Sequence, residues 1–233
     1  MTKELLSKRG IEFEARDIEN DPGALEELRA LGLTTVPAVV VGDRYVTGWN
    51  PPKVAALVGF TLVERVTPPR ELIDSLDMLL EAAVRAVRQV PDEQLMMKSP
   101  DRDRPLRQLA HHVFRVAEAG VDADVLGEFP ANTWLAGGDI PAHTSAARIA
   151  RYGEAVRAKF KAWFAEIDPA AFERVIDADV GPRTLTQVLE RTRFHVAQHL
   201  RQLYVFLEWT GTTPDRPLTA EDLSGIELPD AVW

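Results

Sequence analysis

The chain has 233 residues, of which 36 are acidic and 27 are basic, and it carries a net charge of −9 at pH 7. This acidic balance argues against a protein that coats nucleic acid or an anionic membrane surface. The absence of cysteine excludes disulfides, thiolate nucleophiles and cysteine-bound metal clusters. No apolar run approaches the roughly 18 residues of a membrane span. The first residues lack the apolar segment of a signal peptide, so we expect a cytoplasmic protein.

The first 60 residues alternate short helix-like and strand-like segments, which is typical of an α/β fold. Gly10 and Gly32 suit the left-handed position after a helix, and Asn20-Asp21-Pro22 suits a helix start. Residues 11–18 alternate apolar and polar side chains, as a strand with one buried face does. The predicted order is a helix over 2–9, a strand over 11–18, a helix over 24–31, strands over 36–41 and 44–46, and a helix over 51–58.

The loop Thr35-Val36-Pro37 and the later Gly48, followed by a short helix, resemble the corresponding parts of glutaredoxins, which have the thioredoxin fold. The resemblance implies a cis peptide bond before Pro37 and thiol binding through the backbone at Val36 and Pro37. In that family a first strand and a Cys-x-x-Cys motif precede this part, and this sequence contains neither. We therefore interpret residues 1–60 as an N-terminally incomplete glutaredoxin-like segment.

Two explanations of this incomplete segment stay open. Either the true start of the chain lies upstream, which we favour, or the segment is a remnant without redox activity. A thioredoxin-like sheet that lacks a strand exposes backbone donors and acceptors, which is costly. We therefore expect residues 1–60 to be less stable than the rest of the chain, or to lean on another surface.

After a linker over 61–67, the pattern changes to long amphipathic helices. Apolar residues recur three and four positions apart, which indicates helices with one buried face. A four-helix bundle over 68–211 is the expected architecture, and the whole chain is expected to be an α+β protein with two domains. Helices are predicted over 68–90, 106–121, 145–167 and 185–209, with a long loop over 127–141 as a candidate pocket wall and an irregular tail over 212–233.

Histidines gather on two of these helices. His195 and His199 lie four residues apart, so both imidazoles project from one helical face within reach of one ion. No glutamate separates them, so the pair differs from the metalloprotease motif whose glutamate acts as the general base. His112 follows Leu109 by three residues and shares its inward face, whereas His111 is rotated by about 100°.

Inward-facing histidines are costly in the core of a bundle unless they are hydrogen-bonded or bind a metal. One interpretation is a set of hydrogen-bonded core histidines. The other is a divalent-metal site of His112, His195 and His199. Three protein ligands leave coordination positions open, which is typical of catalytic rather than structural zinc.

The motifs Leu106-x-x-Leu109-x-x-His112 and His195-x-x-x-His199 resemble those of the DinB superfamily of four-helix-bundle metalloproteins, over residues 68–211. The resemblance implies a divalent metal at these three histidines, zinc first and nickel second. Some members of the superfamily are S-transferases or isomerases that use low-molecular-weight thiols, and others have no known activity.

Several residues near these histidines are candidates for contacts to the ligands or to a substrate. Arg115 and Glu118 follow His112 by one and two turns, and Arg191 precedes His195 by one turn. An arginine could hold the carboxylate of a thiol substrate; alternatively, each charge is solvated or pairs along its helix. His111 is a further candidate at the edge of the site, whereas His143 suits a loop or a helix cap.

We expect a metal-dependent S-transferase that activates a small thiol for attack on an electrophile, because the chain has no thiol of its own. A metal-dependent hydrolase and a non-catalytic metal-binding or interaction module stay open as alternatives. For the module, Trp134, Trp233 and the proline-rich tail would form the interface of a homodimer. The expected partners are a small thiol and an electrophile, with neither nucleic acid nor membrane.

Overall fold

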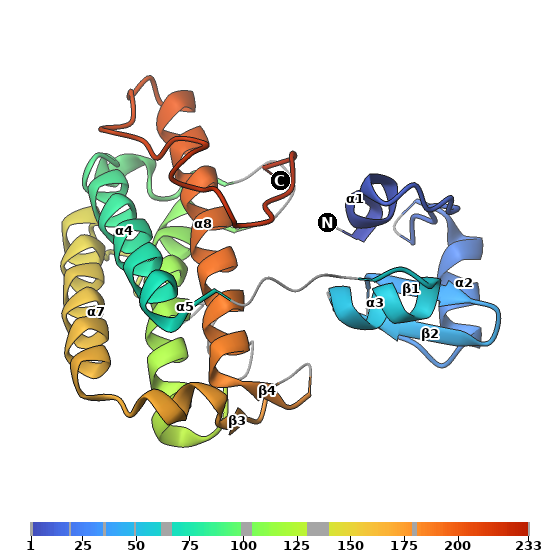
Figure 1. The fold of residues 1–233 in the computed structure, drawn as a ribbon. Helices are drawn as coiled ribbons and strands as arrows, with labels where there is room; N and C mark the ends of the chain where they lie inside the picture. Colours follow the sequence, from blue (N-terminus) through green and yellow to red (C-terminus); the bar gives the residue numbers. More distant parts are fainter. Residues whose placement is uncertain are drawn as a thin grey trace. The chain divides into compact units, whose positions relative to one another are not determined.

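The computed structural model describes residues 2–18, 20–34, 36–48, 50–61, 67–98, 104–129, 140–178 and 181–232, with the backbone alone at Glu4 (Figure 1). The chain divides into two compact units, Met1–Val66 and Thr67–Trp233. The α+β fold class is confirmed, because a small α/β unit precedes a helical one. No helix in the described part is long and apolar enough to cross a membrane.

The first unit combines three short helices with a two-stranded antiparallel sheet. The sheet pairs Ala38 with Thr47 and Val41 with Arg44. Asn50 caps the last helix, because its side chain accepts a hydrogen bond from the Lys53 amide at 3.2 Å. The elements are α1 (Thr2–Lys8), α2 (Pro22–Ala30), β1 (Ala38–Val41), β2 (Arg44–Thr47) and α3 (Pro51–Val58).

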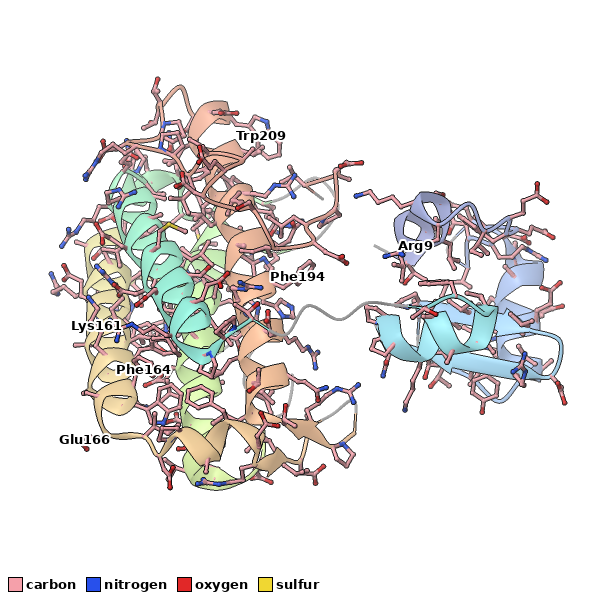
Figure 2. All side chains as sticks on the ribbon, in the orientation of Figure 1. Arg9, Lys161, Phe164, Glu166, Phe194 and Trp209 are labelled. Atoms are coloured by element: carbon pink, nitrogen blue, oxygen red, sulfur yellow. The ribbon has the colours of Figure 1, made fainter. Side chains whose placement is uncertain are left out.

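The apolar centre of this unit is small. Leu5, Leu6 and Val54 form its buried cluster, with partly buried side chains such as Phe60 packed against it. The Arg9 guanidinium lies over the Phe60 ring, 5.4 Å from its centroid. Arg9 is labelled in Figure 2. Five further apolar residues are buried outside this cluster, namely Ala24, Leu28, Leu33, Ala55 and Leu57. The described apolar core is therefore small and divided, and it supplies little stabilisation for a unit of this length.

The strand predicted over 11–18 is not formed, so that prediction is wrong. In the described part of this unit the sheet contains β1 and β2 alone, and an alternating segment becomes a strand only where a neighbouring strand takes its backbone hydrogen bonds. Phe13 is 40% exposed. Arg16 instead forms ion pairs with Asp21 at 3.1 Å and Glu27 at 2.9 Å, which tie this segment to α2.

The second unit is a bundle of four long helices that run side by side (Figure 1). Their inward faces form one apolar core, with Phe114, Phe160 and Phe206 among its largest fully buried side chains. The second helix is five residues longer than predicted and ends where Gly127 adopts a φ of 73°. The four helices are α4 (Pro69–Arg88), α5 (Leu106–Leu126), α7 (Ala146–Glu166) and α8 (Leu185–Trp209).

Small elements that the sequence did not predict connect these helices. The strands β3 (Val175–Ile176) and β4 (Arg183–Thr184) form a short antiparallel hairpin directly before α8. Thr184 then begins α8 with a capping box, in which its hydroxyl and the Gln187 side chain each accept the other residue's amide hydrogen. Single 3₁₀ turns cover Asp92–Gln94 and Pro169–Glu173.

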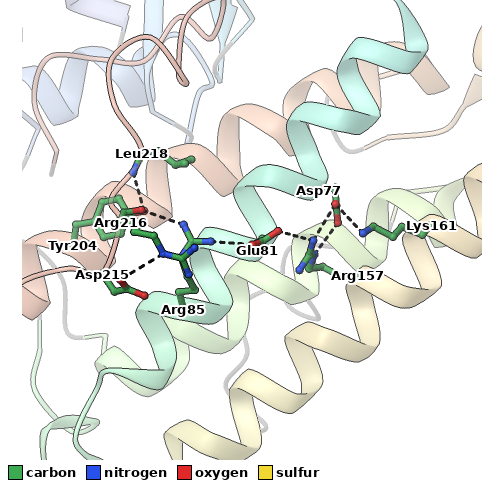
Figure 3. Close-up of polar contacts among 9 residues, drawn as sticks. All are labelled: Asp77, Glu81, Arg85, Arg157, Lys161, Tyr204, Asp215, Arg216 and Leu218. Atoms are coloured by element: carbon green, nitrogen blue, oxygen red, sulfur yellow. Dashed lines mark hydrogen bonds and ion pairs between the residues drawn. The ribbon is translucent and has the colours of Figure 1, made fainter.

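The tail after α8 packs against the bundle. Arg201 donates to the carbonyl oxygens of Pro229 at 2.6 Å and Asp230 at 3.1 Å. The Leu218 amide donates to the Tyr204 hydroxyl at 3.2 Å, as Figure 3 shows. Leucine and isoleucine side chains of the tail also cover the bundle core. The tail is therefore a structural part of the second unit.

Several expectations fall on residues outside the described part. These are most of the linker predicted over 61–67, most of the loop over 127–141 with Trp134, the loop residue Thr35, and Trp233.

Candidate metal centre

Helices α5 and α8 pack against each other and bring three histidines together. The ring centroids of His112 and His199 lie 4.9 Å apart, and those of His195 and His199 lie 5.6 Å apart. His112 and His195 are separated by 6.4 Å. The three predicted ligands therefore form one cluster between two helices.

The positions of these side chains follow from the apolar stripes of the two helices. His112 lies between the buried Leu109 and Val113 and is 9% exposed, and His199 is 8% exposed. His195 is half-buried one turn before His199. It follows Phe194, which is labelled on α8 in Figure 2. The cluster thus has two buried rings and one ring nearer its edge.

Imidazoles are donors that suit zinc and nickel, and the spacing of these three rings can be compared with that of a tetrahedral site. A zinc–nitrogen bond of about 2.0–2.1 Å puts each ring centroid about 3.2 Å from the ion, so tetrahedral ligands have centroids about 5 Å apart. Two of the three separations are close to this value, and the 6.4 Å between His112 and His195 exceeds it. Accordingly, no three His, Asp or Glu side chains in the described part already surround one point as ligands. Coordination by all three rings would require His112 and His195 to come closer together than this.

The surroundings of His199 favour its neutral form. Burial, followed by repulsion from His112 and His195, lowers the pKa of His199 well below its ordinary value. Arg104 lowers it further, and a hydrogen bond to Gln202 partly opposes this shift. Neutral imidazole is the form that binds zinc or nickel, and the lowered pKa keeps His199 neutral at pH 7.

Gln202 touches His199 directly. Its side-chain oxygen lies 2.7 Å from Nδ1 of His199, so Nε2 is the ring nitrogen that Gln202 does not contact. Helical spacing places Gln202 on the same face of α8 as His195 and His199, but the spacing alone indicates no role for it. Arg104 is likewise a residue near His199 that the sequence did not single out.

Comparisons with known proteins identify the family to which the helical unit belongs. The model of the DinB superfamily matches residues 73–203, which is more than half of the chain. The chain belongs to the DinB superfamily. Members of this superfamily generally bind divalent metals, and a metal-associated function follows for this chain.

The first unit has relatives of a different kind. The glutaredoxin family model matches residues 1–46. The glutaredoxin-like protein NrdH of Escherichia coli strain K12 is 38% identical over 50 residues, which cover 22% of this chain and 62% of that protein. The NrdH protein of Shigella flexneri matches with the same identity and coverage. The chain thus spans about 62% of the length of these curated relatives.

The structure places two of the remaining candidates of this DinB-superfamily chain, His111 and Glu118, in contact with α7. The His111 ring stacks on Tyr152 of α7 at 4.7 Å, with the ring planes 16° apart. Both side chains line a cavity of about 290 Å³ between α5, α7 and the segment before α7, together with Arg115 and Arg148. His111 therefore faces α7, whereas His112 faces α8.

Glu118 takes part in a polar contact between α5 and α7. The Tyr152 hydroxyl donates to it at 2.6 Å and the Lys159 ammonium at 3.1 Å. Burial alone would raise the pKa of Glu118, but these donors outweigh burial and lower it, with a smaller attraction from Arg115. Glu118 is thus an ionised carboxylate that joins two helices.

The last candidates are Arg191, His143 and the two residues of the cis-proline loop, Val36 and Pro37. Arg191 is half-buried on α8, and His143 is exposed in the turn before α7. In the first unit Val36 is 52% exposed. The peptide bond before Pro37 is cis, as the glutaredoxin resemblance implies, and the Pro37 carbonyl accepts from the Gly48 amide at 2.8 Å.

Proposed function

We propose that this chain is a metal-dependent S-transferase that binds a divalent ion through His112, His195 and His199. Zinc is the first choice and nickel the second, because neutral imidazole suits both ions. The observation that carries the proposal is the cluster of three imidazoles from α5 and α8, with ring centroids 4.9, 5.6 and 6.4 Å apart. Three protein ligands leave room for a substrate atom.

The substrate atom that fits this site best is the sulfur of an external thiol. A bound divalent ion lowers the pKa of a coordinated thiol and so supplies a nucleophile at neutral pH. The chain has no cysteine, so the thiol must arrive as a co-substrate. Arg104, whose charge acts on His199, adds a positive potential that attracts an anionic thiol.

The glutaredoxin-like segment supports the choice of a thiol. The exposed Val36 and the cis-proline Pro37 occupy the positions that, by the resemblance to glutaredoxins, would bind a thiol. We include these residues in the proposal as a thiol-binding surface of the first unit. Titration of the labelled protein with glutathione should move the NMR signals around Val36, and unchanged signals would remove this surface from the proposal.

A thiol-consumption assay tests the transfer reaction. The zinc-loaded or nickel-loaded chain is incubated with a thiol and a nitroaromatic halide, and the thioether product is measured by mass spectrometry. We expect metal-dependent formation of the thioether and its loss in the His195→Ala, His199→Ala double variant. His143→Ala is the matched control, because His143 is exposed and lies outside the cluster, and this variant should keep full activity.

The alternatives give different results in the same assay. A hydrolase would replace the halide by a hydroxyl group from water and release the halide, without loss of thiol. A non-catalytic module would bind metal and form no product with any thiol or electrophile of the panel. Either result would contradict the proposed transfer.

A further inference from the structure

The amide of Gln202 lies between a proposed metal ligand and the C-terminal tail. Its oxygen is 2.7 Å from Nδ1 of His199, and its nitrogen donates to the Val232 carbonyl at 2.9 Å. The oxygen of this amide therefore contacts His199, and its nitrogen contacts Val232. Val232 follows α8 by more than twenty residues, so this contact closes a long segment back onto the helix.

The contact with the tail fixes which end of the amide faces His199. If the amide were flipped, its oxygen would face the Val232 carbonyl oxygen, and two acceptors would meet without a hydrogen between them. The orientation with nitrogen toward Val232 is therefore strongly favoured. The oxygen must then point at His199, where it can only accept a hydrogen bond.

The amide orientation in turn fixes the tautomer of His199. An acceptor at 2.7 Å from Nδ1 requires the hydrogen on that nitrogen, so the lone pair lies on Nε2. We propose that Gln202 is a positioning residue that, held by the tail at Val232, keeps His199 as the tautomer with hydrogen on Nδ1 and thereby presents Nε2 to a metal. This inference rests on the proposed metal site, but the tautomer can be measured without metal.

Gln198 offers a matched control on the same helix. Its side-chain nitrogen donates to the same Val232 carbonyl at 2.8 Å, and it precedes Gln202 by one turn. Its oxygen accepts from Arg201 at 3.2 Å rather than from a histidine. Loss of Gln198 therefore weakens the docking of the tail, whereas loss of Gln202 removes both the tail contact and the acceptor for His199.

The experiment compares the natural chain with Gln202→Leu and Gln198→Leu as full-length, metal-free proteins. Long-range nitrogen–hydrogen NMR spectra of the histidine rings at pH 8 report the tautomer of each neutral imidazole. We expect hydrogen on Nδ1 of His199 in the natural chain and in Gln198→Leu, and loss of this preference in Gln202→Leu. Hydrogen on Nε2 of His199 in the natural chain would overturn the proposal, whatever the variants do.

Zinc affinity, measured by competition with a chelator, is the second readout. We expect Gln202→Leu to bind zinc about 10–100-fold more weakly, as is typical when the partner of a ligating histidine is lost, and Gln198→Leu to bind as the natural chain does. Equal weakening in both variants would contradict the proposal, because it would trace the effect to the tail alone. A third outcome separates the two proposals. If neither the natural chain nor the variants bind zinc, but His199 of the natural chain carries its hydrogen on Nδ1, the proposed function fails and the tautomer assignment stands.

Discussion

At the scale of single residues, Gly153 sets how closely α7 approaches α5. A Cβ atom at this position would lie 2.5 Å from Cε1 and 2.6 Å from Cζ of the Phe114 ring. The Phe114 ring is fully buried in the bundle core, so it has no free space into which it could move. The small residue is therefore needed for packing rather than for backbone freedom.

We expect Gly153→Ala to lower the free energy of unfolding by about 1–3 kcal/mol, the usual cost of an overpacked core. Alanine is favoured over glycine in helices by about 1 kcal/mol, so a neutral or stabilising result would contradict the packing argument. Urea denaturation followed by circular dichroism measures the change. In a Phe114→Leu background the same substitution should cost less, because the ring atoms in question are gone.

The sequence was most informative for the histidines and least informative for their neighbours. His112, His195 and His199 could be placed on inward faces because helical spacing relates residues within one helix. The role of Gln202 could not be predicted, because one of its partners, Val232, comes from a different segment. Spacing also placed Arg115 and Glu118 near His112, but these side chains turn toward α7.

At the scale of elements, ion pairs join α4 and α7 along the outside of the bundle (Figure 3). Arg157 donates to both carboxylate oxygens of Asp77 at 2.7 and 2.9 Å, and also reaches Glu81 at 3.0 Å. Lys161 lies 2.9 Å from Asp77. The side chains of Asp77 and Arg157 are 24% and 21% exposed, so water screens this pair less than a surface pair.

Asp77→Asn should weaken the contact between α4 and α7 in a pH-dependent way. Burial alone would raise the pKa of Asp77, but Arg157 and Lys161 outweigh it and hold the pKa below its ordinary value. Folding then favours the ionised carboxylate, so its stabilisation is present above about pH 4 and is lost as the pH falls through the lowered pKa. We expect the variant to lose about 1–2 kcal/mol at pH 7 and to show a weaker loss of stability in acid.

Urea denaturation at a series of pH values measures both effects. Asp74→Asn is the control, because Asp74 pairs with Arg70 on the same helix and both side chains are mostly exposed. This control should change the free energy of unfolding by no more than about 0.5 kcal/mol. Equal decreases in the free energy of unfolding of the two variants at pH 7 would contradict the prediction, because the ion pair between α4 and α7 would then stabilise the fold no more than an exposed pair does.

The sequence predicted the long helices better than the short strands. Helices such as α8 carry their apolar period over many residues, and α8 begins and ends where the sequence predicts. A strand depends on a partner elsewhere in the chain, so the alternation over 11–18 was misleading. The hairpin β3–β4 was missed because two residues per strand are too few for a pattern.

At the scale of the whole molecule, the two units differ in the size of their apolar cores. Among the residues that the structure describes, the apolar cluster of the first unit has three buried members, Leu5, Leu6 and Val54, and five more apolar residues of the unit are buried outside it. The cluster of the second unit draws on all four long helices. Since buried apolar area is the main stabilising contribution, the first unit should be the less stable one.

We therefore expect the first unit to open before the second. In native-state hydrogen exchange, amides of α1, α2 and α3 should exchange through openings of lower free energy than amides in the middle of α8. A thermal scan should show an early transition from the same residues. A single cooperative transition, with equal protection in both units, would contradict this prediction.

The central claim of this account is that His112, His195 and His199 form a metal site in a superfamily that generally binds divalent metals. Elemental analysis of untagged protein, purified without a metal resin, tests it most directly. We expect about one equivalent of zinc or nickel per chain, and none in a folded His195→Ala, His199→Ala double variant. A folded natural chain that holds no metal, even after incubation with zinc and nickel, would contradict the claim and leave three hydrogen-bonded core histidines.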